Sequence, residues 1–253
     1  MTGAKHPQHT AFLALLDRLE ESIARPIAKE KDRFIHAAAE RYEAHGTVNF
    51  FDLVDNHQDR ILSILKPHWK LAISGAGHLA LGQMKSRQLK DDDENSLFED
   101  LAQEWVSKEG LKRSHSIADT SEADVLAAIS DGLDDGLGVA EIARNIREVT
   151  DLTPWRAETI ARTETHNAAT YGSIESVRYA EDNLGVEMEK AWAPTIDGRT
   201  RPAHAAMSAD DYIPMDAKFL VDGEEMDRPG DPAGSAENTV NCRCALIYRE
   251  EEK

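Results

Sequence analysis

The chain has 253 residues, of which 41% are hydrophobic, 30% are charged and only 6% are aromatic. This length suits one large domain or two ordinary ones, and the high charge content is typical of a helix-rich protein rather than a compact β-sandwich. A formal net charge of -18 repels phosphate backbones, so it excludes strong non-specific DNA binding by the whole molecule.

Membrane and secretory signals are also missing from the pattern. No stretch approaches the roughly 18 consecutive apolar residues that a membrane span needs. The first ten residues are polar and contain no apolar core of a signal peptide. The two cysteines, Cys242 and Cys244, are one residue apart, which fits free thiols or metal ligands in a reducing compartment. We therefore expect a soluble cytoplasmic protein with no membrane partner.

The first half of the chain shows helical periodicity. Apolar residues recur at intervals of three and four over 11–45, 51–65 and 72–89, and these segments predict three helices. Pro67 marks the end of the second. The acidic run 91–95 predicts a solvated linker, and a short helix is expected over 97–110. The basic segment 108–115 is expected to be a surface loop, with contact to a partner as the alternative.

The pattern changes in the second half. Helices are predicted over 121–133, capped by Ser121, then over 139–149 and 153–184. After Gly185 the period shifts to two, which indicates strands over 186–192, around a hairpin at Asp222-Gly223, and over 244–248. The predicted fold class is therefore α+β, with a mainly helical N-terminal two-thirds followed by a small antiparallel β-rich C-terminal unit.

Unusual polar residues stand near both ends of this β-rich unit. Asp197, Arg199, Arg201 and His204 form an Asp-x-Arg-x-Arg-x-x-His array, and Asn241-Cys242-Arg243-Cys244 closes the chain's last quarter. We expect these two segments to meet in space.

Three interpretations of this cluster stay open: a zinc site, thiols that pack inward, and thiol chemistry of another kind. His204, Cys242, Cys244 and Asp197 could hold zinc, provided that the two thiols, on one face of a strand, converge on the ion. Alternatively, the thiols pack inward beneath the sheet while His204 hydrogen-bonds a turn, and no cofactor is bound.

A buried structural ion-pair network is also expected. Glu164 falls close to the apolar stripe of the helix over 153–184, where a carboxylate needs a cation or backbone donors. We expect the arginines of the β-rich unit to supply them, and we expect Arg199 or Arg243 to pair with Asp197, Asp231 or Glu164. Arg162, Arg201, His204 and Asn241 complete the predicted network.

Signatures of the common enzyme families are absent from the sequence. There is no Walker loop, no G-x-S-x-G elbow, no H-E-x-x-H helix and no dinucleotide fingerprint. An enzyme would have to be a metal- or thiol-dependent hydrolase, or a toxin-like enzyme, built from Asp197, His204, Cys242 and Cys244. We expect instead no catalytic residue and no small-molecule substrate.

The order of the motifs resembles the head-morphogenesis domain of the phage Mu F-like minor head proteins. The pieces are Ala161-Arg162-Thr163-Glu164, Trp192, Asp197-Gly198-Arg199, His204, Val221-Asp222-Gly223, Pro229-Gly230-Asp231 and Asn241-Cys242-Arg243-Cys244. They cover roughly residues 120–250. The resemblance implies a head-morphogenesis-like domain over 119–253, with helices over 120–184 and the β-rich unit over 186–250. The first 120 residues carry no such resemblance, and we expect the amphipathic helices of the N-terminal region 1–118 to dock onto a partner.

The resemblance also implies a function. It implies a minor head protein of the capsid, which we expect to be non-enzymatic, so the expected partners are the portal protein and other head proteins. Related head proteins can carry toxin or transferase domains beyond the Cys-x-Cys end. The expected location is the virion head, and the host cytoplasm during assembly. Contact with DNA is implied for some members, and the net charge of -18 makes it weak here.

Overall fold

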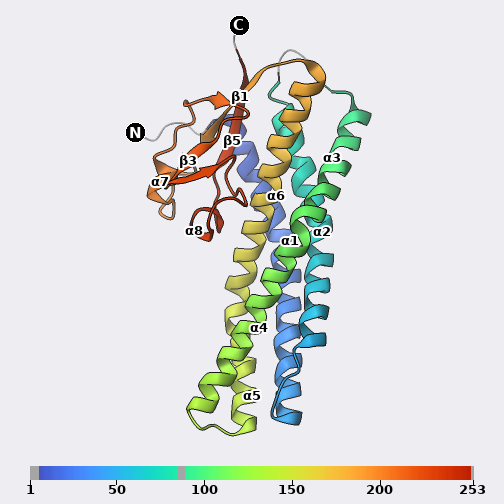
Figure 1. Ribbon diagram of the computed structural model, residues 1–253, viewed down its shortest axis with the longest axis vertical. Helices are drawn as coiled ribbons and strands as arrows, with labels where there is room; N and C mark the ends of the chain where they lie inside the picture. Colours follow the sequence, from blue (N-terminus) through green and yellow to red (C-terminus); the bar gives the residue numbers. More distant parts are fainter. Residues whose placement is uncertain (1–5, 85–88, 252–253) are drawn as a thin grey trace. The chain divides into compact units, whose positions relative to one another are not determined.

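The computed structural model describes residues 6–84 and 89–251, and Figure 1 shows its helices and strands. The chain divides into two compact units. Unit 1 comprises residues 1–20, 68–105 and 162–253, and unit 2 comprises residues 21–67 and 106–161. The predicted border between residues 118 and 119 falls inside a helix of unit 2, so it coincides with no edge of either unit.

Six long helices account for most of the described chain: α1 (Pro7–His45), α2 (Phe51–Leu81), α3 (Asp91–Trp105), α4 (Leu111–Asp134), α5 (Val139–Glu148) and α6 (Thr153–Leu184). The helices predicted over 11–45, 139–149 and 153–184 are confirmed. Two of them end at glycines in the left-handed region, Gly46 (φ +67°) and Gly185 (φ +64°), a backbone that residues with a Cβ rarely adopt. Among the described residues, no helix is both long and apolar enough to cross a membrane.

The predicted break at Pro67 is wrong, because α2 runs through it from Phe51 to Leu81. Buried residues continue at helical spacing on both sides of the proline, at Ile61, Leu65, Trp69 and Ala72. Burial of this stripe outweighs the loss of one backbone donor. The described helix also stops at Leu81, short of the predicted Leu89, and residues 85–88 of that prediction lie outside the described residues.

The linker predicted over 91–95 and the loop predicted over 108–115 are both helical. Residues 91–95 begin α3, where the acidic residues Asp92, Asp93 and Glu94 lie near the positive end of the helix dipole. The π-helical segment η1 (Val106–Gly110) then joins α3 to α4, so the predicted helix end at Gly110 is also wrong.

Ser121 does not cap a helix, because it lies in the middle of α4. Its buried hydroxyl donates to the carbonyl of Ile117 at 3.0 Å and accepts a hydrogen bond from Lys31 Nζ at 2.6 Å. A serine that bonds back to the preceding turn is compatible with a helix interior, so the capping pattern was misleading here.

Each unit has its own apolar core. In unit 2 the core includes Phe34, Ile35, Ala38, Ala39, Tyr42, Leu53, Val125, Ile142, Ala143 and Ile146. Ile142 and Ile146 are buried as the periodicity of α5 predicted. In unit 1 the buried aromatic residues Trp69 and Trp105 meet edge to face, with ring centroids 6.4 Å apart, and Trp105 also contacts Tyr171 of α6.

The strands all belong to unit 1. A three-stranded antiparallel sheet has the order β2 (Ile213–Pro214), β1 (Met188–Ala193), β5 (Ala245–Glu250), and β3 (Phe219–Val221) and β4 (Glu224–Met226) form a separate hairpin. The hairpin turns at Asp222 (φ 51°) and Gly223 (φ 81°), as predicted. Strand β2 and the one-turn helices α7 (Pro202–Ala205) and α8 (Ala236–Thr239) were not predicted. The α+β fold class is confirmed.

Gly172 shows how closely α6 approaches α2 within unit 1. A Cβ placed on Gly172 would lie 2.5 Å from the carbonyl oxygen of Ile73 and 2.6 Å from its Cα. Because these are backbone atoms, neither can rotate away. We predict that Gly172→Ala lowers the free energy of unfolding by about 3 kcal/mol, the upper end of the usual cost of overpacking.

Urea denaturation measures this effect. Gly198→Ala is the matched control, because nothing lies within 4 Å of a Cβ at Gly198 and its φ is outside the left-handed region. The control should change stability by no more than about 0.5 kcal/mol. Equal stability of the two variants would contradict the close approach.

Candidate functional site

The pairing of the first and last strands brings the two polar segments together. In the antiparallel register of β1 and β5, Ala193 lies opposite Ala245. The segment that follows β1 and the segment that precedes β5 therefore lie at the same end of this strand pair. Beyond the sheet, Thr195 Oγ1 still donates to the carbonyl of Arg243 at 2.6 Å. The prediction that these segments meet is confirmed.

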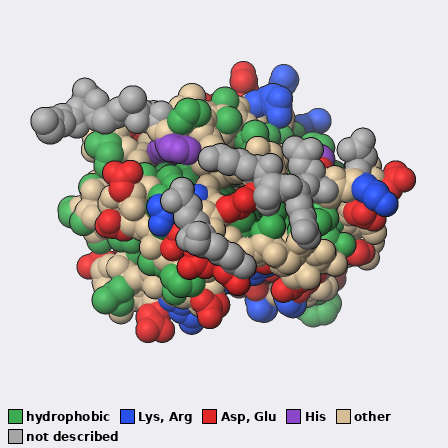
Figure 2. Space-filling model, turned by 90° about the horizontal axis from the view of Figure 1, so that it is seen from above, with side chains coloured by type: hydrophobic (Ala, Val, Ile, Leu, Met, Phe, Trp, Pro, Cys, Tyr) green, Lys and Arg blue, Asp and Glu red, His purple; other side chains and the backbone are tan. Residues whose placement is uncertain are grey.

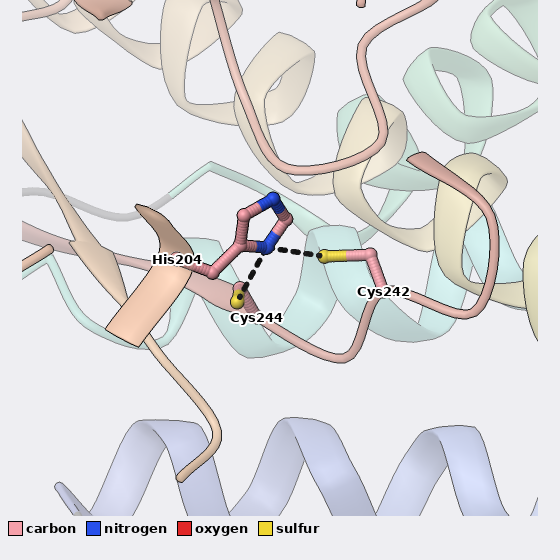
Figure 3. A group of neighbouring side chains, drawn as sticks. All are labelled: His204, Cys242 and Cys244. Atoms are coloured by element: carbon pink, nitrogen blue, oxygen red, sulfur yellow. Dashed lines mark hydrogen bonds between the residues drawn. The ribbon is translucent and has the colours of Figure 1, made fainter. Parts of the chain in front are cut away.

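A buried cluster of one imidazole and two thiols occupies this meeting point. His204, on α7, directs Nδ1 toward both sulfurs, which lie at 3.6 Å (Cys242) and 3.5 Å (Cys244), and Figure 3 shows both contacts ending on the same ring nitrogen. Each of the three residues is only 2% exposed. Among the described residues, this is the one group of three or more His, Cys, Asp and Glu side chains whose ligand atoms all lie within 4.8 Å.

The prediction that the thiols lie on a strand is wrong, because Cys242 and Cys244 lie in an irregular segment between a turn and β5. In that turn Asn241 has φ 57°, a left-handed conformation that asparagine tolerates, and the amide of Cys242 donates to the carbonyl of Thr239 at 3.3 Å. In this irregular segment both sulfurs approach one nitrogen.

Arg243, between the cysteines, makes ion pairs that were not predicted. Its guanidinium bonds Asp17 at 2.5 Å and Glu20 at 3.2 Å, both on α1. Glu20 also lies 3.5 Å from Arg162 Nε on α6. Two arginines therefore share one carboxylate of α1, and Arg243 pairs with neither Asp197 nor Asp231.

Two further contacts, with Trp192 and Asn238, hold the His204 ring in place. Trp192 of β1 packs edge to face against it, with centroids 5.4 Å apart at 84°. On the far side, Nε2 lies 3.3 Å from Asn238 Oδ1, and Asn238 Nδ2 donates to Glu224 Oε2 at 2.8 Å. Since a carboxylate only accepts, Glu224 fixes the amide orientation, so Nε2 of His204 carries the proton and Nδ1 presents its lone pair to the sulfurs. Sequence reasoning missed Asn238, because the one-turn α8 leaves no periodic signal.

The two thiols have very different proton affinities. Cys242 donates a hydrogen bond to the sulfur of Cys244, which raises the pKa of Cys242 well above its usual range and lowers the pKa of Cys244 well below it. The sulfur of Cys242 also accepts the backbone N–H of Cys244, and the sulfur of Cys244 accepts that of Thr195. Of the two sulfurs, the cluster therefore favours negative charge on Cys244 and keeps the proton on Cys242.

Asp197 lies outside this cluster. Its half-exposed carboxylate accepts from the backbone N–H of Arg199 at 2.8 Å and from Thr200 Oγ1 at 3.2 Å, and the Arg199 N–H is the main reason why the pKa of Asp197 is lowered. Arg199 Nη2 lies 3.6 Å from this carboxylate, but the arginine is exposed. Asp197 thus stabilises its own turn and is not close enough to be the predicted fourth ligand.

The other predicted network residues also serve local structure. Arg201 donates to the carbonyl of Val240 at 2.6 Å, and Asp231 accepts the backbone N–H groups of Asp227 and Ala233 within the Pro-Gly-Asp turn. Asn241 accepts from Arg162 Nη1 at 3.1 Å. The structure therefore spreads the predicted residues over several small groups.

Glu164 is buried as predicted, being 6% exposed. Its Oε2 accepts a hydrogen bond from the indole Nε1 of Trp69 at 3.2 Å. This bond joins α6 to α2, and the pairing of Glu164 with an arginine of the β-rich unit stays a prediction. Other residues of α6 bond the C-terminal segment: His166 Nε2 donates to the carbonyl of Cys244 at 2.7 Å, and Ser173 bonds Tyr248 at 2.9 Å.

The buried charges between α6 and the strands come from residues that the sequence did not single out. Lys190 of β1 is fully buried and pairs with Asp227, which also accepts from Arg178 of α6 at 2.8 Å. Nearby, the buried Arg228 donates to Thr170 Oγ1 at 2.9 Å and lies 5.8 Å from the ring centroids of Trp105 and Tyr171.

Comparison with known proteins gives a family and two relatives. Residues 123–247 match the family model of Phage Mu protein F like protein. Minor head protein GP7 of Bacillus phage SPP1 is 34% identical over 125 residues, which cover 49% of this chain and 39% of the relative. The NAD(+)--arginine ADP-ribosyltransferase EFV of Enterococcus faecalis is 33% identical over 136 residues, which cover 54% of this chain and 27% of the relative. The chain thus spans less than half the length of either relative, and no solved structure matches it significantly.

The matched region runs from within α4 to β5 and contains the whole His204, Cys242 and Cys244 cluster. It agrees with the range of about 120–250 that the motif order predicted. Through residues 123–247, the chain belongs to the Phage Mu protein F-like family.

Proposed function

We propose that this chain is a non-enzymatic minor head protein that acts in phage head morphogenesis and binds the portal or the inner face of the head. The observation that carries the proposal is the family match over residues 123–247, together with the 34% identity to the minor head protein GP7. Its location would then be the virion head, and the host cytoplasm during assembly.

The exposed residues of unit 2 support a docking role. Leu152, just before α6, and Trp155, in its first turn, are 52% and 64% exposed, and Leu133 and Val139 at the α4–α5 turn are 60% and 43% exposed. Tryptophan and leucine exposed at a surface are characteristic of sites that bury apolar area against another protein. We propose that this end of unit 2 contacts a head protein.

The charge of the surface favours a protein partner over DNA. Figure 2 shows Asp and Glu side chains over much of one face, with fewer Lys and Arg among them. In the segment 108–115, Lys112 and Arg113 lie 3.4 Å and 3.9 Å from Glu109, and His115 lies 3.2 Å from Asp119. These acids offset the local positive charge, so the segment is a poor site for a phosphate backbone.

Co-expression with the portal protein encoded in the same phage genome tests the proposal. We expect the chain to co-purify with the portal oligomer and to be present in assembled heads. Trp155→Ser should weaken the association, whereas Leu220→Ser, which changes a residue 68% exposed in unit 1, should leave it unchanged. Absence of the chain from purified heads would contradict the proposal.

The alternative enzyme would use His204, Cys242 and Cys244 on a substrate. Each of these residues is only 2% exposed, and the His204 nitrogen that would act as a base is already shared by the two sulfurs. A substrate would have to displace the surrounding turn to reach them. The transferase activity named for the Enterococcus faecalis relative belongs to a protein of which this chain matches 27%. We therefore propose that this chain has no catalytic activity.

A further inference from the structure

We propose that His204, Cys242 and Cys244 bind one Zn²⁺ ion, which holds together the non-helical part of unit 1. The chemistry of the three side chains suits this metal. Two thiolates and a neutral imidazole are ligands that zinc prefers, and here they are buried and converge on a common centre.

The distances fit a zinc ion at that centre. Bonds of about 2.3 Å to sulfur and about 2.0–2.1 Å to nitrogen, set at the tetrahedral angle, place nitrogen and sulfur about 3.6 Å apart. His204 Nδ1 lies 3.6 Å from the sulfur of Cys242 and 3.5 Å from that of Cys244. Both nitrogen–sulfur distances therefore already match those of ligands that share one ion.

An S–H···N hydrogen bond has a similar length, but Nδ1 has a single lone pair and can accept one thiol. An ion at the common centre accounts for both short contacts at once, because it uses the one lone pair of Nδ1 and a separate lone pair on each sulfur.

A hydrogen bond on the far side of the imidazole fixes the tautomer of His204. A histidine that ligates metal usually donates its other ring N–H to a carbonyl or carboxylate, which fixes its tautomer. Asn238 Oδ1 accepts from His204 Nε2 at 3.3 Å, and Glu224 and the carbonyl of Val221 hold the Asn238 amide at 2.8 Å and 3.5 Å. Nδ1 is therefore the free ligand atom, and it faces the sulfurs.

The position of the ligands indicates a structural role. They come from α7 and from the irregular segment before β5, and the supporting Asn238 comes from α8. These segments contain one-turn helices and strands of two to six residues, which bury little apolar surface of their own. One ion would connect them, at the cost of two thiol protons released on binding. Among the described residues the chain supplies three ligands of the His, Cys, Asp and Glu type, so a water molecule would take the fourth position.

Metal analysis of the full-length chain tests the proposal. We expect one zinc ion per molecule after purification without chelators or a histidine tag, and replacement by Co²⁺ should produce thiolate-to-cobalt absorption. Cys244→Ser and His204→Gln should lose the metal. Asp197→Asn is the matched control, because Asp197 is close in sequence but outside the cluster, and it should retain a full equivalent.

The wild-type measurement keeps the proposal testable even if a ligand variant fails to fold. Folded wild-type protein with no bound zinc, both as purified and after incubation with excess Zn²⁺, would overturn it. A disulfide between Cys242 and Cys244 in protein purified in a reducing buffer would overturn it as well. So would one bound ion of a different metal per molecule. Equal loss of zinc in Asp197→Asn and Cys244→Ser would show that the metal is bound elsewhere.

Discussion

Replacing Asp227 with alanine is expected to destabilise the protein by about 3–5 kcal/mol, the cost of leaving a buried charge without its partner. Lys190 is the charge in question. Its side chain is fully buried, and its ammonium group bonds both the carboxylate and, at 2.9 Å, the backbone carbonyl of Asp227. Burial also lowers the pKa of Lys190, which is the sign that its charged form is poorly solvated.

A denaturation series distinguishes this buried pair from an ordinary one. Lys190→Met removes the buried cation and leaves Asp227 paired with Arg178 at 2.8 Å, so we expect it to cost clearly less than Asp227→Ala. Glu99→Ala is the control in the same unit, because the Lys70–Glu99 pair is about half exposed on both sides. An exposed pair contributes no more than about 1 kcal/mol. If Asp227→Ala and Glu99→Ala shift the urea midpoint equally, Lys190 is not buried as described.

The long helices could be predicted because their apolar stripes repeat at 3.6 residues, but their ends could not all be predicted. Gly46 and Gly185 stop α1 and α6 because a left-handed turn is a local property of glycine. Pro67 does not stop α2, because Trp69, two residues later, is fully buried and its burial requires the helix to continue. The burial of Trp69 depends on tertiary packing, which the local sequence does not show. Local signals are reliable only where packing agrees with them.

The candidate site was predictable to the extent that it depends on the order of segments. His204 and the two cysteines flank paired strands, so the antiparallel sheet had to bring them together. The supporting residues depend on the register and on short turns. Asn238 comes from a one-turn helix, and Asp227, which directly follows β4 of the hairpin, meets Lys190 of β1 in the three-stranded sheet. Neither contact follows from spacing along the chain.

Acid is expected to destabilise the fold through His68, and this effect can be isolated. His68 is 5% exposed and its Nε2 bonds Thr165 Oγ1 at 2.6 Å, while burial lowers the pKa of His68 from 6.5 to about 4. Between these two values the unfolded chain binds a proton that the folded chain excludes. Stability is therefore complete above pH 6.5 and falls as the pH drops toward 4. The lowered pKa corresponds to a loss of about 3 kcal/mol.

His68→Gln removes this titration and keeps a side chain that can bond Thr165. Urea denaturation of both proteins at neutral pH and near pH 4 measures the difference. We expect the wild type to lose about 2–3 kcal/mol more than the variant over this interval. Subtraction is required because burial also lowers the pKa values of His57 and His166, which act in the same direction in both proteins. Equal losses would mean that His68 is solvated in the folded state, and the packing of α2 against α6 at Thr165 would then have to be revised.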